Sequence, residues 1–138
     1  MGVVHRQIGK DGTLLWEGVA VQPYHGGGVS EGSCRTVLIG PQDGAQHFAI
    51  RYFEIPPRGQ SSFEDHLHDQ GVVILKGRAR VLLGWEMHEV GPGDAIYIPQ
   101  NEQHQFENVS DEPFGFLCVI PSKKWLAKLE TLTGAPRP

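Results

Sequence analysis

Two histidines and a glutamine occupy alternate positions directly before an apolar run in the middle of the chain. His66, His68 and Gln70 precede the run Val72–Leu75. In an extended strand, alternate side chains point to the same side, so these three groups would project together beside an apolar wall. Imidazole and amide groups with free lone pairs are donors that suit divalent transition metals. The spacing therefore predicts the start of a metal site.

The chain as a whole has the size of one domain. Its 138 residues can bury a hydrophobic core, and its 18 glycines and 10 prolines favour many short strands joined by turns. We expect a single domain over residues 1–138, with a barrel core at about 47–121 and a C-terminal helix at about 122–133. The N-terminal arm, 1–46, either covers a barrel end or crosses to a second subunit.

Composition and charge argue against several classes of partner. The formal net charge is −4 and the chain has no long basic cluster, so we expect neither nucleic acid nor a membrane surface as partner. No apolar stretch approaches the roughly 20 residues of a membrane span, and the N-terminus lacks the apolar core of a secretory signal. The two cysteines, Cys34 and Cys118, form no disulfide framework, which predicts a cytoplasmic protein with free thiols.

Short segments with strand character recur about every 8–12 residues and end at turn residues, which indicates an antiparallel sandwich or small barrel. The expected strands are 36–39, 47–55, 72–75, 78–83, 85–90, 95–98, 103–108 and 114–120. Their aromatic side chains Tyr52, Phe53, Trp85 and Tyr97 are expected in the core. The one expected helix begins after Ser122, which can cap it, and carries an apolar stripe. The fold class is therefore all-β with one short C-terminal helix.

A second histidine segment lies downstream, at residues 93–108. It resembles the second signature motif of the cupin superfamily, whose fixed points are matched here by Gly93, Pro99, His104 and Asn108. Asn101 stands in place of the motif's second glycine, and asparagine tolerates the positive φ that such a turn requires.

The first cupin motif also has a counterpart. Gly59, His66, His68 and Gly77 look like its fixed points, and Gln70 stands in the place of the family's glutamate after a shortened loop. The resemblance covers about residues 47–121. It implies a cupin double-stranded β-helix, a jelly-roll barrel with a metal inside one end, and a homodimer. It also implies the metal ligands, namely His66, His68, Gln70 and His104.

Such a ligand set is neutral. A divalent ion bound to it would keep its Lewis acidity and favour an anionic substrate. The donors suit one divalent transition metal ion, Fe, Mn, Ni, Co or Zn.

Residues outside the ligand set are candidates for contacts with a small-molecule substrate. Arg51 interrupts an apolar strand, so it either faces solvent or lines the cavity and holds a carboxylate. Phe106 shares the parity of His104, and Phe116 lies on one face of the last strand. We take all three as candidate substrate-binding residues.

Two groups are candidates for catalysis. Glu64 shares the parity of His66 and could lie at the rim of the site as a general base, a role for which Glu102 is a further candidate. Cys118 is either a small buried thiol or a pocket group near the metal.

Several functions remain open at this stage. The first is a non-haem Fe(II) dioxygenase acting on a small organic molecule, as the resemblance implies. A non-redox metal-dependent isomerase, lyase or cyclase is the second, and a non-enzymatic small-molecule-binding cupin is the third. A cupin without metal is the remaining alternative.

Overall fold

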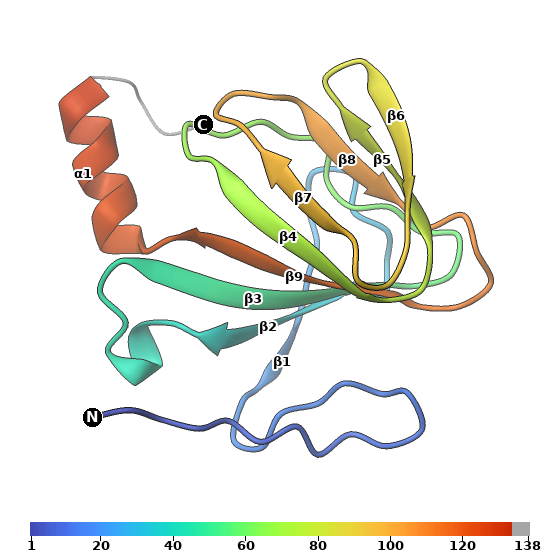
Figure 1. Ribbon diagram of the computed structural model, residues 1–138, viewed down its shortest axis with the longest axis horizontal. Coiled ribbons are helices and arrows are strands. Elements are labelled where there is room, and N and C mark those ends of the chain that lie inside the picture. The colour runs from blue at the N-terminus through green and yellow to red at the C-terminus, as the bar shows by residue number, and fades with distance from the viewer. Residues whose placement is uncertain (134–138) are drawn as a thin grey trace.

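Two antiparallel sheets face each other in the computed structural model, which describes residues 1–133 (Figure 1). The large sheet has six strands in the order β1 (Val21–Pro23), β2 (Cys34–Ile39), β3 (Phe48–Ile55), β9 (Phe114–Pro121), β4 (Gln70–Lys76) and β7 (Ala95–Ile98). The small sheet has the order β6 (Glu86–Val90), β5 (Ala79–Leu83) and β8 (His104–Glu107). A 3-10 turn, η1 (Pro41–Asp43), and one helix, α1 (Lys123–Thr133), complete the described elements. The all-β prediction with a C-terminal helix is confirmed, and no helix among residues 1–133 is long and apolar enough to cross a membrane.

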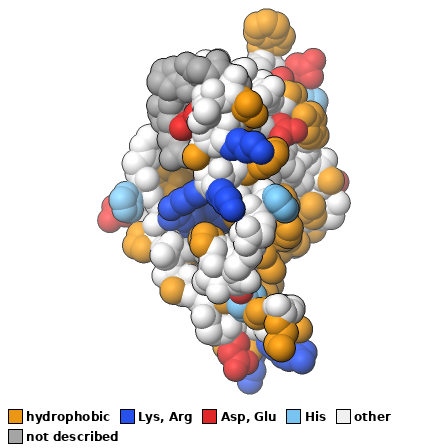
Figure 2. All heavy atoms as spheres, turned by 90° about the vertical axis from the view of Figure 1, so that its left-hand side faces the viewer, with side chains coloured by type: hydrophobic (Ala, Val, Ile, Leu, Met, Phe, Trp, Pro, Cys, Tyr) orange, Lys and Arg blue, Asp and Glu red, His pale blue; other side chains and the backbone are white. Residues whose placement is uncertain are grey.

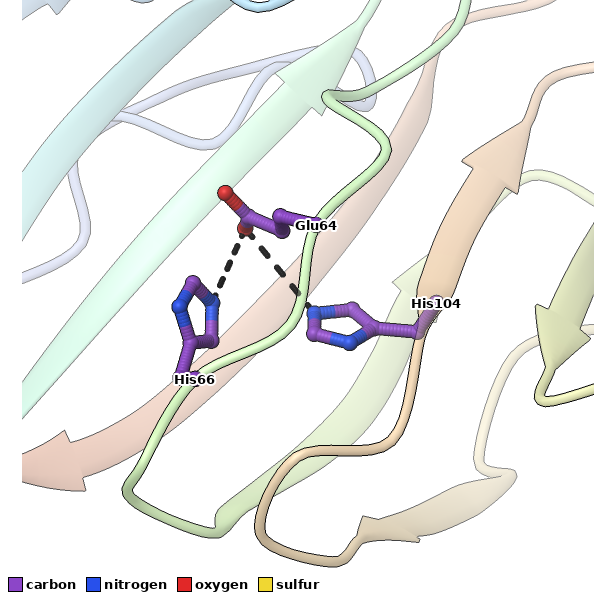
Figure 3. A group of neighbouring side chains, drawn as sticks. All are labelled: Glu64, His66 and His104. Atoms are coloured by element: carbon purple, nitrogen blue, oxygen red, sulfur yellow. Dashed lines mark ion pairs between the residues drawn. The ribbon is translucent and has the colours of Figure 1, made fainter. Parts of the chain in front are cut away.

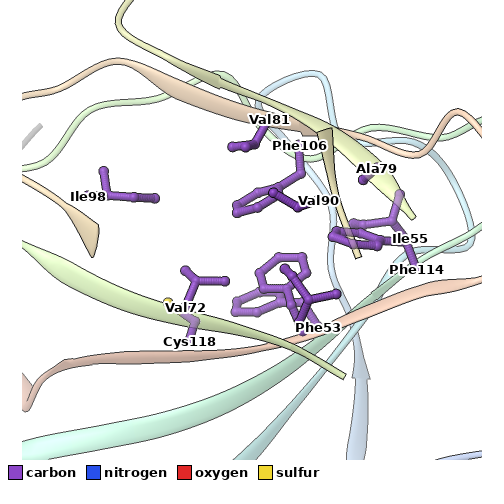
Figure 4. Packing of buried hydrophobic residues seen from close by; sticks show 12 residues of the cluster. Phe53, Ile55, Val72, Ala79, Val81, Val90, Ile98, Phe106, Phe114 and Cys118 are labelled. Atoms are coloured by element: carbon purple, nitrogen blue, oxygen red, sulfur yellow. The ribbon is translucent and has the colours of Figure 1, made fainter. Parts of the chain in front are cut away.

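The hydrophobic core fills the space between the two sheets (Figure 4). Alternate residues of β9 point into it, so Phe114, Phe116 and Cys118 are all buried. The ring of Phe116 stacks on that of Phe106 from β8, with centroids 4.5 Å apart. The aromatic contact therefore joins the large sheet to the small one.

Two turn positions explain residues of the signature motifs. Asn101 has a φ of 62°, which confirms that asparagine replaces glycine there in the left-handed region. Gly77 has a φ of 78°, and a Cβ at this position would lie 2.5 Å from the carbonyl oxygen of Pro113. Both the backbone conformation and the close approach therefore require glycine at residue 77.

The large sheet begins earlier in the chain than the expected barrel core, because β1 pairs with β2 and β2 pairs with β3. The arm before β1 lies against its own chain. Trp16 packs on Tyr52 with ring centroids 5.3 Å apart, and the Lys76 ammonium donates to the Gly12 carbonyl at 2.8 Å. Part of the arm thus covers the outer face of the large sheet.

Two aromatic residues do not lie in the core, contrary to the expectation from sequence. Trp85 is 96% exposed because it sits in the turn between β5 and β6. Tyr97 is 64% exposed because its position on β7 faces outward, and its hydroxyl donates to Asp69 at 2.9 Å. Tyr52 and Phe53 are buried as expected.

Asn108, the last fixed point of the second motif, holds a turn together and faces the interior. Its side-chain amide donates to the carbonyls of Ile55, Pro56 and Glu112, and its oxygen accepts from the Ser110 amide and hydroxyl. Its side chain is 1% exposed, so water cannot replace these bonds.

Asn108→Ala should lower the free energy of unfolding by at least about 2 kcal/mol, since buried carbonyls lose their donor. Urea unfolding measures this change. Gln46→Ala, which removes an exposed amide with one local hydrogen bond, is the control and should change stability by less than about 0.5 kcal/mol. Equal effects of the two substitutions would contradict the structural role of Asn108.

Candidate metal centre

A short backbone pairing brings Glu64 beside His104. The Glu64 amide donates to the His104 carbonyl at 3.1 Å, and the His104 amide donates to the Glu64 carbonyl at 2.9 Å. Residues that exchange both bonds in an antiparallel pair present neighbouring side chains on one face. The carboxylate of Glu64 and the imidazole of His104 therefore lie side by side at the start of β8 (Figure 3).

Glu64, His66 and His104 form one cluster of potential ligand atoms, all within 4.8 Å of one another. Oε1 of Glu64 lies 3.1 Å from Nε2 of His66 and 3.8 Å from Nε2 of His104. Ligand atoms about 2.1 Å from a shared ion lie about 3.0 Å apart at right angles and about 3.4 Å apart in a tetrahedron. The distance from Glu64 to His66 fits this range, and the 3.8 Å from Glu64 to His104 is a few tenths of an ångström longer than the tetrahedral value, so the cluster is close to the size of a mononuclear metal site.

His104 presents an unprotonated nitrogen to this cluster. Its Nδ1 lies 2.9 Å from the Glu102 carbonyl oxygen, which requires a proton on Nδ1 and leaves Nε2 unprotonated in the neutral ring. Burial lowers the pKa of His104, whose side chain is 3% exposed, and this favours the neutral form that binds metals. The carbonyl of Glu102 therefore orients the ring in the way that metal-binding histidines require.

Gln70 lies next to His104 at the start of β4. Its Nε2 is 3.3 Å from Nε2 of His104, and its Oε1 accepts from the Cys118 thiol at 3.6 Å. Rotation of the amide by 180° would exchange its oxygen and nitrogen and direct the oxygen toward the cluster. The ligand role of Gln70 stays a prediction that this position supports.

His68 does not lie in a strand. Residues 67 and 68 form a bend, and β4 begins only at Gln70. The ring of His68 stacks on that of His66, with centroids 4.6 Å apart and planes 7° apart. It lies outside the three-residue cluster, yet its buried Nε2 has no hydrogen-bond partner within residues 1–133. An orphaned imidazole nitrogen beside the cluster fits a further metal ligand.

The buried ring of His68 should make stability depend on pH. Burial, together with the nearby His66 and Arg51, lowers the pKa of His68 to about 4 from its ordinary 6.5. Below the ordinary pKa, the unfolded chain binds a proton that the folded chain does not. Stability is therefore lost as the pH falls from 6.5 toward 4.

Urea unfolding of metal-free protein at about pH 7 and pH 5 measures this dependence. His68→Gln should reduce it. His88→Gln removes a half-exposed histidine that pairs with Glu86 and should leave it unchanged. An identical pH dependence in wild type and His68→Gln would contradict the assignment.

The carboxylate of Glu64 changes the charge of the site from the neutral set expected from sequence. Burial opposes its ionisation, but hydrogen bonds from His66 and Ser62 outweigh this effect and lower the pKa of Glu64. The ionised carboxylate of Glu64 therefore adds a negative charge to the cluster at neutral pH. In the sequence, the only signal for Glu64 is that it lies two residues before His66. Its contact with His104 arises from the antiparallel bridge between residues 64 and 104.

The remaining candidate residues, Cys118, Arg51, Phe106 and Phe116, lie outside the cluster. The Cys118 thiol, 2% exposed, lies 3.5 Å from Nη2 of Arg51 and 3.6 Å from Oε1 of Gln70. Burial raises the pKa of Cys118, so it is a protonated thiol at neutral pH. Arg51 lines a cavity of about 520 Å³, whereas Phe106 and Phe116 are core residues, 3% and 4% exposed, that do not line it.

Comparison with known proteins identifies relatives of this architecture. The 1-methylthio-D-xylulose 5-phosphate methylsulfurylase of Rhodospirillum rubrum is 42% identical over 82 residues, which are 59% of this chain and about half, 53%, of that protein. A cupin 2 conserved barrel domain protein from Rhodopseudomonas palustris has a TM-score of 0.75 at 31% identity, over 86% of this chain and 80% of that one.

The polyketide cyclase RemF from Streptomyces resistomycificus has a TM-score of 0.71 at 31% identity, over 88% of this chain and 79% of that one. The family model described as the cupin domain matches residues 51–120, which is more than half of the chain. This stretch contains both histidine segments and all the strands that surround the cluster. The chain therefore belongs to the cupin family.

Proposed function

We propose that this cupin is a mononuclear metal-dependent enzyme that moves a proton on a small organic molecule without redox chemistry, as an isomerase, lyase or cyclase does. The position of Glu64 carries this proposal. Its carboxylate touches both imidazoles of the cluster and is still 40% exposed, so a substrate can reach it. Two relatives of at least 30% identity are a methylsulfurylase and a polyketide cyclase, and neither name denotes an oxygenase.

The proposed metal ligands are His66 and His104, with His68 and Gln70 completing the set and Glu64 able to join it. A bound divalent ion supplies Lewis acidity that polarises a carbonyl or hydroxyl oxygen of the substrate. The residues fit such an ion because the cluster has the required spacing and His104 presents an unprotonated Nε2.

The chain's own residues perform the remaining tasks. Glu64, ionised at neutral pH, accepts a proton from substrate carbon or oxygen at the rim and returns it. The guanidinium of Arg51 orients an anionic end of the substrate.

Solvent deuterium exchange tests the proposal without knowledge of the product. The protein loaded with Zn(II) or Mn(II) is incubated anaerobically in D₂O with a panel of hydroxyketones, ketose phosphates and enolisable diketones, and loss of carbon-bound protons is followed by NMR. We expect exchange or turnover with at least one compound. Absence of both with every metal and compound would contradict the proposal.

A second candidate, a non-haem Fe(II) dioxygenase, is favoured by one observation. Two histidines and a carboxylate, here His66, His104 and Glu64, are the ligand type of many non-haem Fe(II) oxygenases. Oxygen uptake by Fe(II)-loaded protein with thiol, diketone and catechol substrates would select this function. Turnover that persists with Zn(II) in the absence of oxygen would select the first.

We also propose that the protein is a homodimer that uses the outer face of the large sheet. Val73, Val119, Tyr97 and Phe48 are each 39–64% exposed on or beside this face. Light scattering after gel filtration should give twice the chain mass, and Val73→Asp with Val119→Asp should shift it to one chain. A monomeric wild type would contradict this proposal.

A further inference from the structure

Two arginines lie close together on the core-facing side of the large sheet. Arg35 on β2 pairs with Phe53 on β3, and Arg51 lies two residues before Phe53 on the same face. Such diagonal neighbours in an antiparallel sheet are about 7–8 Å apart, within reach of one ligand for side chains of this length. The strand register therefore brings two guanidinium groups to one place.

Neither arginine has a carboxylate partner among residues 1–133. Arg35 donates to the Gln22 amide oxygen at 3.3 Å, while Arg51 lies over the Phe53 ring at 4.8 Å and contacts the Cys118 thiol. Nε of both side chains is buried without a hydrogen-bond partner in this part of the chain. Half-buried cations with free donors are costly, and an anionic ligand would remove that cost.

Two other arginines show what ordinary pairing looks like in this protein. Arg58 forms an ion pair with Asp111 at 2.9 Å, and Arg80 forms one with Glu107 at 3.1 Å. Both lie at the surface, where pairing is worth little. Arg35 and Arg51 differ from these two, because they are half-buried and no ion pair with a carboxylate is found for them within residues 1–133.

Both arginines line the cavity of about 520 Å³, which lies between the large sheet, the N-terminal arm and the start of α1. Lys123 adds a basic group to its wall, while the imidazole of His5 is already paired with Asp43 at 2.7 Å. Val37, Ala49 and Ile120 add apolar surface. Figure 2 shows Lys and Arg side chains gathered among hydrophobic ones on the face that carries α1. This volume and lining suit a small molecule with one strongly anionic group.

We propose that this cavity binds the phosphoryl group of a phosphate monoester substrate, held by Arg35 and Arg51. The inference rests on the proposed function, because it names the anionic group of the substrate that Arg51 is proposed to orient. A phosphate monoester carries about −1.5 to −2 charges and has three acceptor oxygens. Two guanidinium groups can therefore form more charge-assisted hydrogen bonds with it than with a ligand that carries a single carboxylate. Arg51 lies 3.5 Å from the Cys118 thiol, and this thiol lies 3.6 Å from the Gln70 amide oxygen, so two contacts separate Arg51 from the residue beside His104.

Calorimetric titration tests the inference on protein freed of metal by chelation and dialysis, so that phosphate cannot bind through an ion. The probes are glycerol 3-phosphate, inorganic phosphate and succinate. Wild type should bind glycerol 3-phosphate more tightly than succinate. Arg35→Gln should weaken this binding by about tenfold or more, the loss expected for a charged hydrogen-bond partner. Arg80→Gln, the same substitution at the surface, should leave it unchanged.

Circular dichroism and thermal unfolding verify that the variants fold, and Arg35→Lys, which keeps the charge, should bind with intermediate affinity. The inference is overturned if metal-free protein binds no phosphate ester, if Arg35→Gln and Arg80→Gln bind alike, or if succinate binds more tightly. Metal content separates the two proposals. Protein that takes up metal on reconstitution but binds no phosphate ester contradicts this inference alone. Protein that shows Arg35-dependent ester binding but takes up no metal when Zn(II), Mn(II) or Fe(II) is added back contradicts the proposed enzyme alone.

Discussion

His104→Ala is expected to abolish stoichiometric metal binding. The substitution removes an Nε2 that points into the cluster and whose ring is already oriented by the Glu102 carbonyl. Loss of groups that only orient a ligand weakens metal binding by about 10–100-fold, so loss of the ligand itself should exceed about 100-fold. Metal analysis after incubation with Fe(II), Mn(II) or Zn(II) and dialysis gives the result directly.

Matched variants separate ligand loss from damage to the fold. His104 is 3% exposed, so its removal leaves a small cavity, whereas His66 is 22% exposed and His66→Ala should lose metal without such a cost. His88→Ala removes a histidine outside the cluster and should bind metal as wild type does. Bound metal should also raise the melting temperature of wild type but not of the His66 and His104 variants. Equal metal content in all four proteins would remove the basis for every role assigned to the cluster.

Glu64→Gln is expected to reduce turnover by about 10²–10⁴-fold, the usual contribution of general acid–base catalysis. Glutamine keeps the size and one oxygen of the side chain but cannot accept the proton. Metal binding should fall far less than in His104→Ala, because the imidazoles remain. The rate of deuterium exchange with the first active compound of the panel, measured beside metal content, distinguishes the two effects.

Glu102→Gln is the control for this substitution. Glu102 lies two residues before His104, but its carboxylate is near Gly84 and outside the cluster; only its backbone carbonyl contacts the histidine. Glu102→Gln should therefore keep wild-type turnover. If Glu64→Gln retains wild-type turnover, Glu64 is not the general base, and the proton must be accepted by another group.

Much of the fold could be read from the sequence because its signals are local. The alternation of β9 and the turn residues around β7 predict these strands almost to the residue, as 114–120 against Phe114–Pro121 and 95–98 against Ala95–Ile98. The exposed Trp85 was missed because strand propensity says nothing about which residue a tight turn places at its tip.

The candidate site divides in the same way. His104 and the pair His66 and His68 were found because their spacing matches the cupin motifs. A bend at residues 67 and 68 replaces the extended backbone that the alternation assumes, yet the rings of His66 and His68 still stack with centroids 4.6 Å apart. A two-residue period contains no information about such a bend, because the bend forms in the folded chain.

The sequence alone determined an all-β chain with a C-terminal helix, a histidine-bearing segment before β4 and a further histidine at the start of β8. Only the tertiary structure decided that Glu64 joins His66 and His104, because its partner is 40 residues away and is reached through one antiparallel bridge. The same holds for Arg35 and Arg51, whose proximity follows from the register of β2 against β3. Strand pairing joins residues that are far apart in the sequence, so it determines which charged side chains lie next to each other. These neighbours in turn determine the charge of the candidate metal site and that of the cavity lined by Arg35 and Arg51.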